Sequence, residues 1–264
     1  MGVPLLLLGL LLPFVPLVVW AFAATWRFPA LLPQRYSLRP LRIVSDPSSD
    51  VLTGLATSTI IAVVVAVVSG AIGLAAGRAL GLHAFRGRRL VQFLLLAPVI
   101  VPGIAVSVGI QVVFIRYGLA DTVPGVVLAH LIPTTPYVCL VMASTFAGFD
   151  TSYEDQARVL GASPWQVLRN VTLPAVLPGL AVAMTFAFLI SWSEYVLTLL
   201  IGGGVVKTLP LLLFAYVGSA DTPVAAMLSL VVVLPPLLLL VLTSRVLSGR
   251  GAAPTGAVVG LGGL

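Results

Sequence analysis

Long apolar runs alternate with short polar stretches along almost the whole chain. Each run holds about 20 residues or more, which is the length that an α-helix needs to cross the hydrocarbon core of a bilayer. The pattern predicts an all-α integral membrane protein with six transmembrane helices. We place these spans at residues 1–25, 52–77, 90–117, 126–149, 178–200 and 224–247.

The segments around the spans complete the predicted organisation. Residues 26–51 are rich in arginine and proline and are expected to form an external loop, residues 52–247 the core domain, and the Gly- and Ala-rich residues 248–264 a disordered cytoplasmic tail. Pro98, Pro102 and Gly103 are expected to break the third helix at membrane depth. Pro235–Pro236 are expected to interrupt the sixth.

The composition excludes a soluble fold, because 59% of the residues are hydrophobic and only 8% are charged, against about 25% charged in soluble domains. The net charge of +6 does not indicate nucleic acid as a partner, since the arginines flank apolar runs and no basic stripe with interleaved aromatics occurs. The single cysteine, Cys139, lies in an apolar run and the two histidines are isolated, so we expect no metal site.

A basic turn at residues 78–89 sets the expected orientation, because it holds four arginines and no acid, and cytoplasmic loops are enriched in such residues. Six spans then place both termini in the cytoplasm, together with a polar stretch at residues 150–179. The four arginines of the first loop oppose this assignment. Charge alone therefore favours the orientation by a narrow margin.

The polar stretch at residues 150–179 differs from the rest of the chain. Thr151 or Ser152 can cap a first short helix, Gly161 can end it, and Ser163 can cap a second helix. The local pattern therefore predicts a helix, a glycine bend and another helix between spans four and five. A polar bend at this position is expected to serve a partner or a conformational change, since it cannot pack in the bilayer.

The spacing in this stretch resembles the signature loop of permease subunits in binding-protein-dependent ATP-binding cassette (ABC) importers. That pattern is E-A-A, three residues, G, nine residues, I, one residue and L-P. Asp155–Ala157, Gly161, Val171 and Leu173–Pro174 stand at the corresponding positions. The first block departs from the pattern by Asp for Glu and Gln for Ala, and Glu154 just before it can supply the usual acid.

The resemblance implies that residues 150–172 are a coupling helix that docks on a separate ATPase subunit. Gly161 would allow the bend, Ala157 a close approach, and Trp165 an aromatic anchor. The coupling residues expected from the resemblance are Glu154, Asp155, Ala157, Gly161, Ala162, Ser163 and Trp165.

The resemblance also implies that this chain is not an enzyme and holds no cofactor, because ATP and Mg are bound by the partner ATPase subunits. The expected partners are a second permease subunit, two ATPase subunits, an extracytoplasmic solute-binding protein and the lipid bilayer. The expected location is a bacterial or archaeal plasma membrane, which the chain crosses several times.

Within the family, residues 36–39, 193–198 and 206–210 are similar to the second permease subunit of spermidine/putrescine importers. The resemblance therefore implies a small solute, with a polyamine as the first expectation. The same subgroup resembles permeases for thiamine, iron(III), sulfate, molybdate and phosphonates, which remain alternatives. A secondary transporter that works without ATP is the competing class, because broken helices and a buried acid suit it as well.

Glu194 is the acid within the apolar run of the fifth span, where an ionised carboxylate is costly and should face a cavity or a partner. It either lies on the substrate pathway and attracts an amine, or it packs near the outer interface, held by Ser191, Ser193 or Lys207. Gln111 and Tyr195 complete the expected pathway residues.

Overall fold

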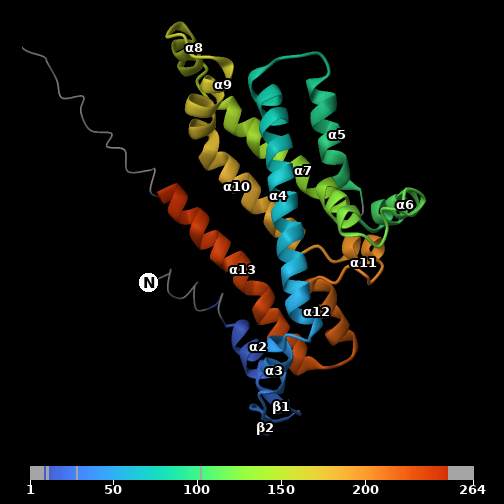
Figure 1. Cartoon of the computed structure of the whole chain (residues 1–264). Coiled ribbons are helices and arrows are strands. Elements are labelled where there is room, and N and C mark those ends of the chain that lie inside the picture. Colours follow the sequence, from blue (N-terminus) through green and yellow to red (C-terminus); the bar gives the residue numbers. More distant parts are fainter. Residues whose placement is uncertain (1–8, 10–11, 28, 102, 249–264) are drawn as a thin grey trace, which may run out of the picture.

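The computed structural model describes residues 9, 12–27, 29–101 and 103–248. Long helices run beside one another, with α8 and α9 at one end and a small hairpin at the other (Figure 1). In chain order the elements are α2 (Phe14–Ala21), β1 (Ala23–Thr25), β2 (Arg35–Tyr36), α3 (Arg39–Ser45), α4 (Asp50–Leu82), α5 (Arg88–Ile100), α6 (Gly103–Arg116), α7 (Val123–Ala147), α8 (Ser152–Val159), α9 (Pro164–Val167), the π-helical turn η1 (Leu168–Thr172), α10 (Leu173–Trp192), α11 (Val196–Gly202), α12 (Leu209–Gly218) and α13 (Thr222–Ser248).

Within the described residues, four helical runs are long and apolar enough to cross a membrane. Helices α5 and α6 form a pair bent by 91°, which adds a fifth if both halves belong to one span. The predicted helix break near Pro98 and Gly103 is therefore confirmed, since α5 ends at Ile100 and α6 begins at Gly103. The predicted first span lies partly outside the described residues, so the count of six stays a prediction. The four runs are Asp50–Leu82, Val123–Ala147, Pro164–Trp192 and Thr222–Arg245.

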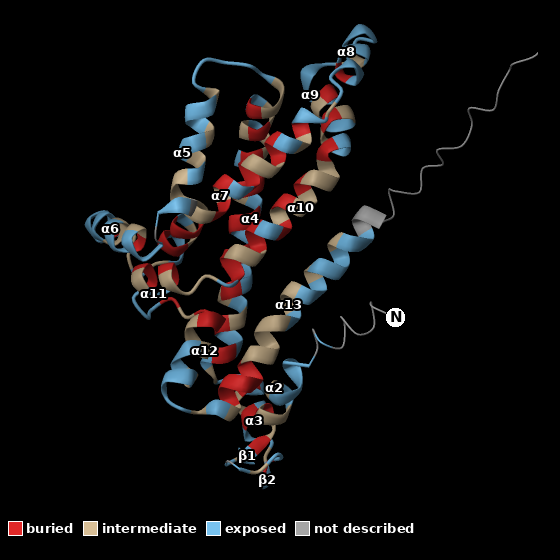
Figure 2. Cartoon of the chain, turned by 180° about the vertical axis from the view of Figure 1, so that it is seen from behind, coloured by how far each residue is buried: buried red, intermediate tan, exposed pale blue. Residues whose placement is uncertain are grey.

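The core lies where α4, α7 and α10 meet, and Figure 2 shows buried residues gathered on these helices while α5 and the far end of α13 are largely exposed or half-buried. Glycines let α4 and α7 approach closely. A Cβ added to Gly77 would lie 2.8 Å from the carbonyl carbon of Met142, closer than real side chains come. The backbones are therefore in near contact, which is a common packing mode of membrane helices.

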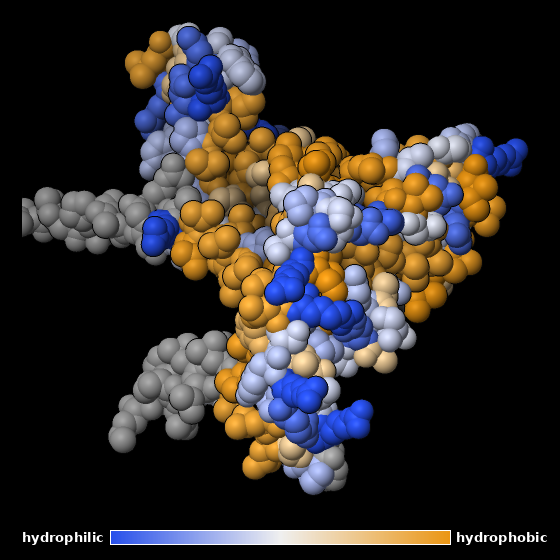
Figure 3. All heavy atoms as spheres, turned by 60° about the horizontal axis from the view of Figure 1, so that its bottom comes forward, coloured by the Kyte–Doolittle hydropathy of each residue, from blue (hydrophilic) through white to orange (hydrophobic). Residues whose placement is uncertain are grey.

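The chain departs from the predicted all-α fold in one small hairpin. Strands β1 and β2 pair antiparallel, with Ala23 opposite Tyr36, so the end of the predicted first span is extended backbone. Helix α3 lies in the predicted external loop, and Figure 3 shows hydrophilic residues gathered in separate patches, this end included, with apolar surface between them. The predicted disordered tail, apart from Ser248, lies outside the described residues.

Two other predicted boundaries are wrong. Helix α13 continues through Pro235 and Pro236 instead of breaking there, because proline is tolerated in membrane helices when the freed backbone groups are satisfied again. The predicted fifth span at residues 178–200 ends at Trp192 and begins further back, since one helical run extends over Pro164–Trp192. The second helix of the polar stretch therefore leads directly into a membrane span.

Candidate functional site

Residues 150–172 form the element that we call the elbow. Gly161 has a left-handed backbone with φ of 87°, which a glycine adopts without the steric cost of a side chain. The Ser163 backbone N–H donates to the Gln166 side chain at 2.7 Å, and the Gln166 N–H donates to Ser163 Oγ, which completes a capping box. The expected side-chain cap from Thr151 is not formed; Asp150 instead accepts from the Ser152 N–H at 2.9 Å.

Behind the elbow lies a buried carboxylate. Glu154 is only 1% exposed, and its two oxygens accept from both Nη atoms of Arg78 on α4 at 2.7 and 2.6 Å. Arg158 donates a third bond at 3.0 Å, and Thr172 Oγ1 donates a fourth at 2.5 Å. One side chain thus joins α8 to the long helix α4 and to the end of the π-helical turn.

These bonds stabilise the ionised form of Glu154. The hydrogen bonds from Arg78 are the main cause that lowers the pKa of Glu154 to about 2, with Thr172 adding to the effect and burial opposing it. A bidentate arginine–carboxylate pair also fixes the relative angle of the two groups. The elbow is therefore held to the helix bundle by a charged contact that persists at neutral pH.

The outward face of the elbow carries acid, aromatic and aliphatic side chains. Asp155 is 67% exposed and paired with Arg158, while Trp165 is 66% exposed and Val159 and Leu160 are each 87% exposed. Of the other residues predicted here, Gly161 and Ser163 are exposed and Ala157 and Ala162 are half-buried. Sequence reasoning did not select the apolar pair at 159–160. The feature of the sequence that could have identified these two residues is an apolar pair directly before a helix-ending glycine, within an otherwise polar stretch.

At the far end of α10, the chain breaks at residues 193–195 before α11. Glu194 lies in this break, and its Oε1 accepts from the Leu197 N–H at 3.0 Å. The side chain lines a cavity of about 280 Å³ together with Pro98, Ser107 and Pro133 from the broken third span and from α7. Within the described residues, none of the side chains proposed for a packing role bonds the Glu194 carboxylate, although the Ser191 carbonyl accepts from the Glu194 backbone N–H. Ser191 bonds His130, Ser193 bonds a backbone carbonyl, and Lys207 bonds Asp50.

The other two predicted pathway residues lie outside this cavity. Gln111 Nε2 donates to the Leu200 carbonyl at 2.9 Å and so joins α6 to α11. The ring of Tyr195 packs on Phe214 of α12, with centroids 4.2 Å apart. Of the three residues, the structure therefore brings only Glu194 to the cavity.

His130 of α7 is hydrogen-bonded to residues on both sides of the helix break at residues 193–195. It is 1% exposed, and its ring nitrogens lie 2.9 Å from Ser191 Oγ, before the break, and 2.9 Å from Thr198 Oγ1, after it. One imidazole thus connects α7 to both sides of the segment that holds Glu194. The sequence shows a lone histidine near the start of a span and favours a hydrogen-bonded role over a ligand, without identifying the partners.

Membrane-length helices, a bent helix pair and a cavity lined by one carboxylate are typical of integral membrane transport proteins. Residues 71–250 match the family described as binding-protein-dependent transport system inner membrane component. The chain belongs to this family, and it is a multi-pass inner-membrane permease subunit of the ABC importer type, as its sequence predicted. Its relatives are permease subunits and not enzymes.

The individual relatives are named for the transport of different solutes. The spermidine/putrescine transport system permease protein PotC of Haemophilus influenzae is 30% identical over 168 residues, which cover 64% of this chain and 65% of that protein. The molybdenum transport system permease protein ModB of Mycobacterium bovis is 31% identical over 244 residues, or 85% and 86% of the two chains. A solved bacterial ABC transporter involved in alginate import has a TM-score of 0.69 at 18% identity and 92% coverage of both chains, which shows a shared fold.

Proposed function

We propose that this permease subunit carries a small organic cation of the polyamine class through a path that passes Glu194. The observation that carries the proposal is the position of that carboxylate, which lines a cavity between broken helices together with Ser107 and mainly apolar residues. An anionic group at membrane depth is costly unless it faces a cavity or a counter-charge. A primary ammonium group supplies that charge, and the PotC relative is named for spermidine and putrescine.

The proposed assembly pairs this chain with a second permease, two ATPase subunits that bind ATP and Mg, and an extracytoplasmic binding protein. In it, the chain crosses the membrane six times with both termini and the elbow in the cytoplasm. The family description, with its reference to a binding protein, supports this assembly. The basic turn before α5 supports the orientation.

The elbow is proposed to receive the ATPase. Its exposed Val159, Leu160 and Trp165 supply apolar and aromatic area of the kind that anchors interfaces. Asp155 is the acid available for direct contact, because its side chain is exposed while Glu154 is turned inward. Glu154 then acts as a positioning residue that keeps the elbow attached to α4 while the partner moves.

Molybdate is the second candidate cargo, because the ModB relative matches 85% of this chain at 31% identity. Polyamines are cations and molybdate is an anion, so a carboxylate at position 194 should affect the uptake of the two solutes in opposite ways. A carboxylate attracts a polyamine and repels an oxyanion. Glu194→Gln should thus reduce polyamine uptake, whereas a molybdate permease should lose little or gain.

The test is ATP-driven uptake by the complete transporter in proteoliposomes, with its binding protein outside and either labelled putrescine or molybdate as cargo. We expect putrescine uptake that falls at least about tenfold in Glu194→Gln, the effect of roughly 1.4 kcal/mol, and normal uptake in Ser193→Ala as a matched control. Unchanged uptake in an assembled Glu194→Gln transporter would exclude the pathway role.

The same preparation separates an importer from a secondary transporter. An importer requires ATP and an intact elbow, so Gly161→Leu should abolish uptake because a leucine strains the left-handed turn. The conservative Gly161→Asn tolerates that backbone better and should retain part of the activity. Uptake that proceeds without ATP, or that survives Gly161→Leu, would favour a secondary transporter.

A further inference from the structure

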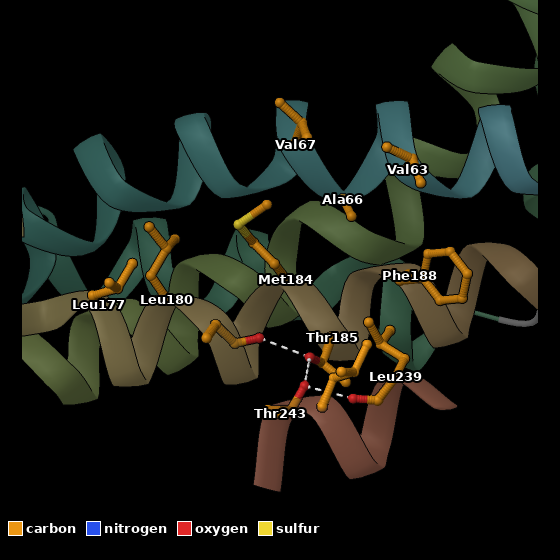
Figure 4. Close-up of a pocket in the computed structure, with 12 residues that line it drawn as sticks. Val63, Ala66, Val67, Leu177, Leu180, Met184, Thr185, Phe188, Leu239 and Thr243 are labelled. Carbon is orange, nitrogen blue, oxygen red and sulfur yellow. Dashed lines mark hydrogen bonds between the residues drawn. The ribbon is translucent and has the colours of Figure 1, made fainter. Parts of the chain in front are cut away.

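The helix break that holds Glu194 joins two helices whose positions are set by different contacts. Figure 4 shows Thr185 of α10 facing Thr243 of α13, and their hydroxyl oxygens lie 2.8 Å apart. Trp192, the last residue of α10, adds a second bond, since its Nε1 donates to the Val232 carbonyl of α13 at 3.0 Å. Helix α11 instead packs against α6 and α7. The break therefore connects two parts of the bundle that are held separately.

The position of the Glu194 carboxylate depends on the first turn of α11. Its Oε1 accepts from the Leu197 N–H at 3.0 Å, and so satisfies one of the backbone donors that a helix leaves unpaired at its start. The cavity that Glu194 lines also has Ile132 and Pro133 of α7 in its wall. The placement of this first turn against α7 therefore determines where the carboxylate stands in the cavity.

His130 bonds that first turn to α7. Its Nε2 lies 2.9 Å from Oγ1 of Thr198, the residue after Leu197, and its Nδ1 lies 2.9 Å from Oγ of Ser191 in the last turn of α10. The ring is buried and does not line the cavity, so a solute in the cavity does not touch it. Any effect of His130 on transport must therefore act through the groups that it holds.

The hydrogen bonds around the ring assign its tautomer. Thr198 Oγ1 donates to the Glu194 carbonyl at 3.2 Å. Because a hydroxyl has a single hydrogen, Nε2 is then the donor to Thr198. The other nitrogen of a neutral imidazole is an acceptor, and the Ser191 hydroxyl donates to it. The bonds thus run in one direction, from Ser191 through His130 and Thr198 to the backbone of Glu194.

We propose that His130 is a positioning residue for the solute path, which holds the Glu194 carboxylate at the cavity by fixing the first turn of α11 against α7. This inference rests on the pathway role proposed for Glu194. Of the two bonds, the one to Thr198 matters more, because the carboxylate is bonded to the same turn. The bond to Ser191 matters less, since α10 keeps its contacts with α13 without it.

The test is ATP-driven putrescine uptake by the complete transporter in proteoliposomes, with ATP hydrolysis measured in parallel. The loss of one neutral hydrogen bond changes an equilibrium by about fivefold, so Thr198→Val and His130→Leu should each reduce the putrescine carried per ATP hydrolysed by about that factor. Ser191→Ala should reduce this ratio less. The amide of His130→Gln replaces Nε2 and should restore most of the ratio, whereas His130→Asn, whose amide replaces Nδ1, should not.

A double-mutant cycle determines whether His130 acts through Glu194. In a Glu194→Gln transporter the carboxylate is already absent, so Thr198→Val should cause no further loss. The matched control is Ser69→Ala, which removes another buried hydrogen bond to α7, made with Thr134 at 3.0 Å. That variant should keep the wild-type ratio, because its bond does not reach the break. Thermal unfolding verifies that each variant is folded.

The failure of this inference can be told apart from the failure of the pathway role. Equal losses from Thr198→Val with and without the Glu194 carboxylate, or an equal loss in Ser69→Ala, would overturn the positioning role alone. Unchanged uptake in Glu194→Gln would remove the pathway role and this inference with it. Nitrogen NMR of histidine-labelled protein checks the tautomer, with His83→Gln to assign the two histidines. A ring protonated at Nδ1 alone would overturn the assigned direction of the bonds.

Discussion

The contact between Glu154 and Arg78 gives the sharpest prediction, made on the substitution Glu154→Gln. The amide keeps the size of the side chain but removes the charge that accepts two bonds from Arg78. A pKa lowered from 4.5 to about 2 corresponds to about 3 kcal/mol of stabilisation at neutral pH. Loss of one partner from a buried pair costs about 3–5 kcal/mol. Since Arg78 is 32% exposed and can regain water, we expect the lower figure.

The assay is thermal unfolding of the purified chain in detergent. Using the scaling of soluble domains, about 2–4 °C per kcal/mol at this size, Glu154→Gln should lower Tm by roughly 6–12 °C. Asp155→Asn is the matched control, because that neighbouring acid is 67% exposed and exposed pairs contribute about 1 kcal/mol or less. Glu154 and Asp155 are adjacent in the sequence, but the decrease in Tm should be several times larger for Glu154→Gln than for Asp155→Asn.

Equal shifts in the two variants would refute this reasoning. A double-mutant cycle with Arg78→Gln adds a second criterion, because residues in direct contact are non-additive. If the losses of Glu154→Gln and Arg78→Gln simply add, the bidentate contact contributes nothing to stability. The elbow would then be held to the bundle by its apolar contacts.

Three further predictions follow from the same contacts. The folded-state pKa of Glu154 is depressed, so its contribution is present above about pH 4.5 and declines as pH falls toward 2; the Tm difference between wild type and Glu154→Gln should shrink by more than half between pH 6 and pH 3. Gly77→Val should prevent folding because its side chain meets the Met142 backbone, whereas Gly103→Val, with open space around it, should fold, as size-exclusion profiles would show. His130→Leu leaves two buried hydroxyls without their shared partner and should reduce stability by about 1–3 kcal/mol, seen as a lower Tm.

The sequence predicts the helical membrane fold, the broken third span and the shape of the elbow, because these depend on local signals such as apolar length, proline and caps. It does not identify Glu154 as buried. Its partner Arg78 lies 76 residues away, and an acid in a polar stretch ordinarily faces water. The segment from Ser193 to Tyr195 likewise contains no glycine or proline, so its helix break follows from long-range contacts.

The same distinction explains the error at Pro235–Pro236. Proline is a strong breaker signal in water, but a membrane helix has no solvent to satisfy the backbone groups that a break would expose. Continuing the helix is then the cheaper arrangement, and α13 runs unbroken through both residues. Local propensity is therefore less reliable in the spans than in the elbow.

One helical run joins the elbow to the segment that holds Glu194, and this connection determines how a displacement of one can reach the other. The 29 residues of Pro164–Trp192 extend over roughly 43 Å at 1.5 Å per residue, from the elbow to the break that holds Glu194. The π-helical turn is the point at which such a run could flex, but its last residue, Thr172, bonds Glu154. While that bond and the Arg78 contact hold, a displacement of the elbow must carry α4 and α10 together, and it reaches the Glu194 segment directly because that segment continues from α10, where the Ser191–His130 bond joins it to α7.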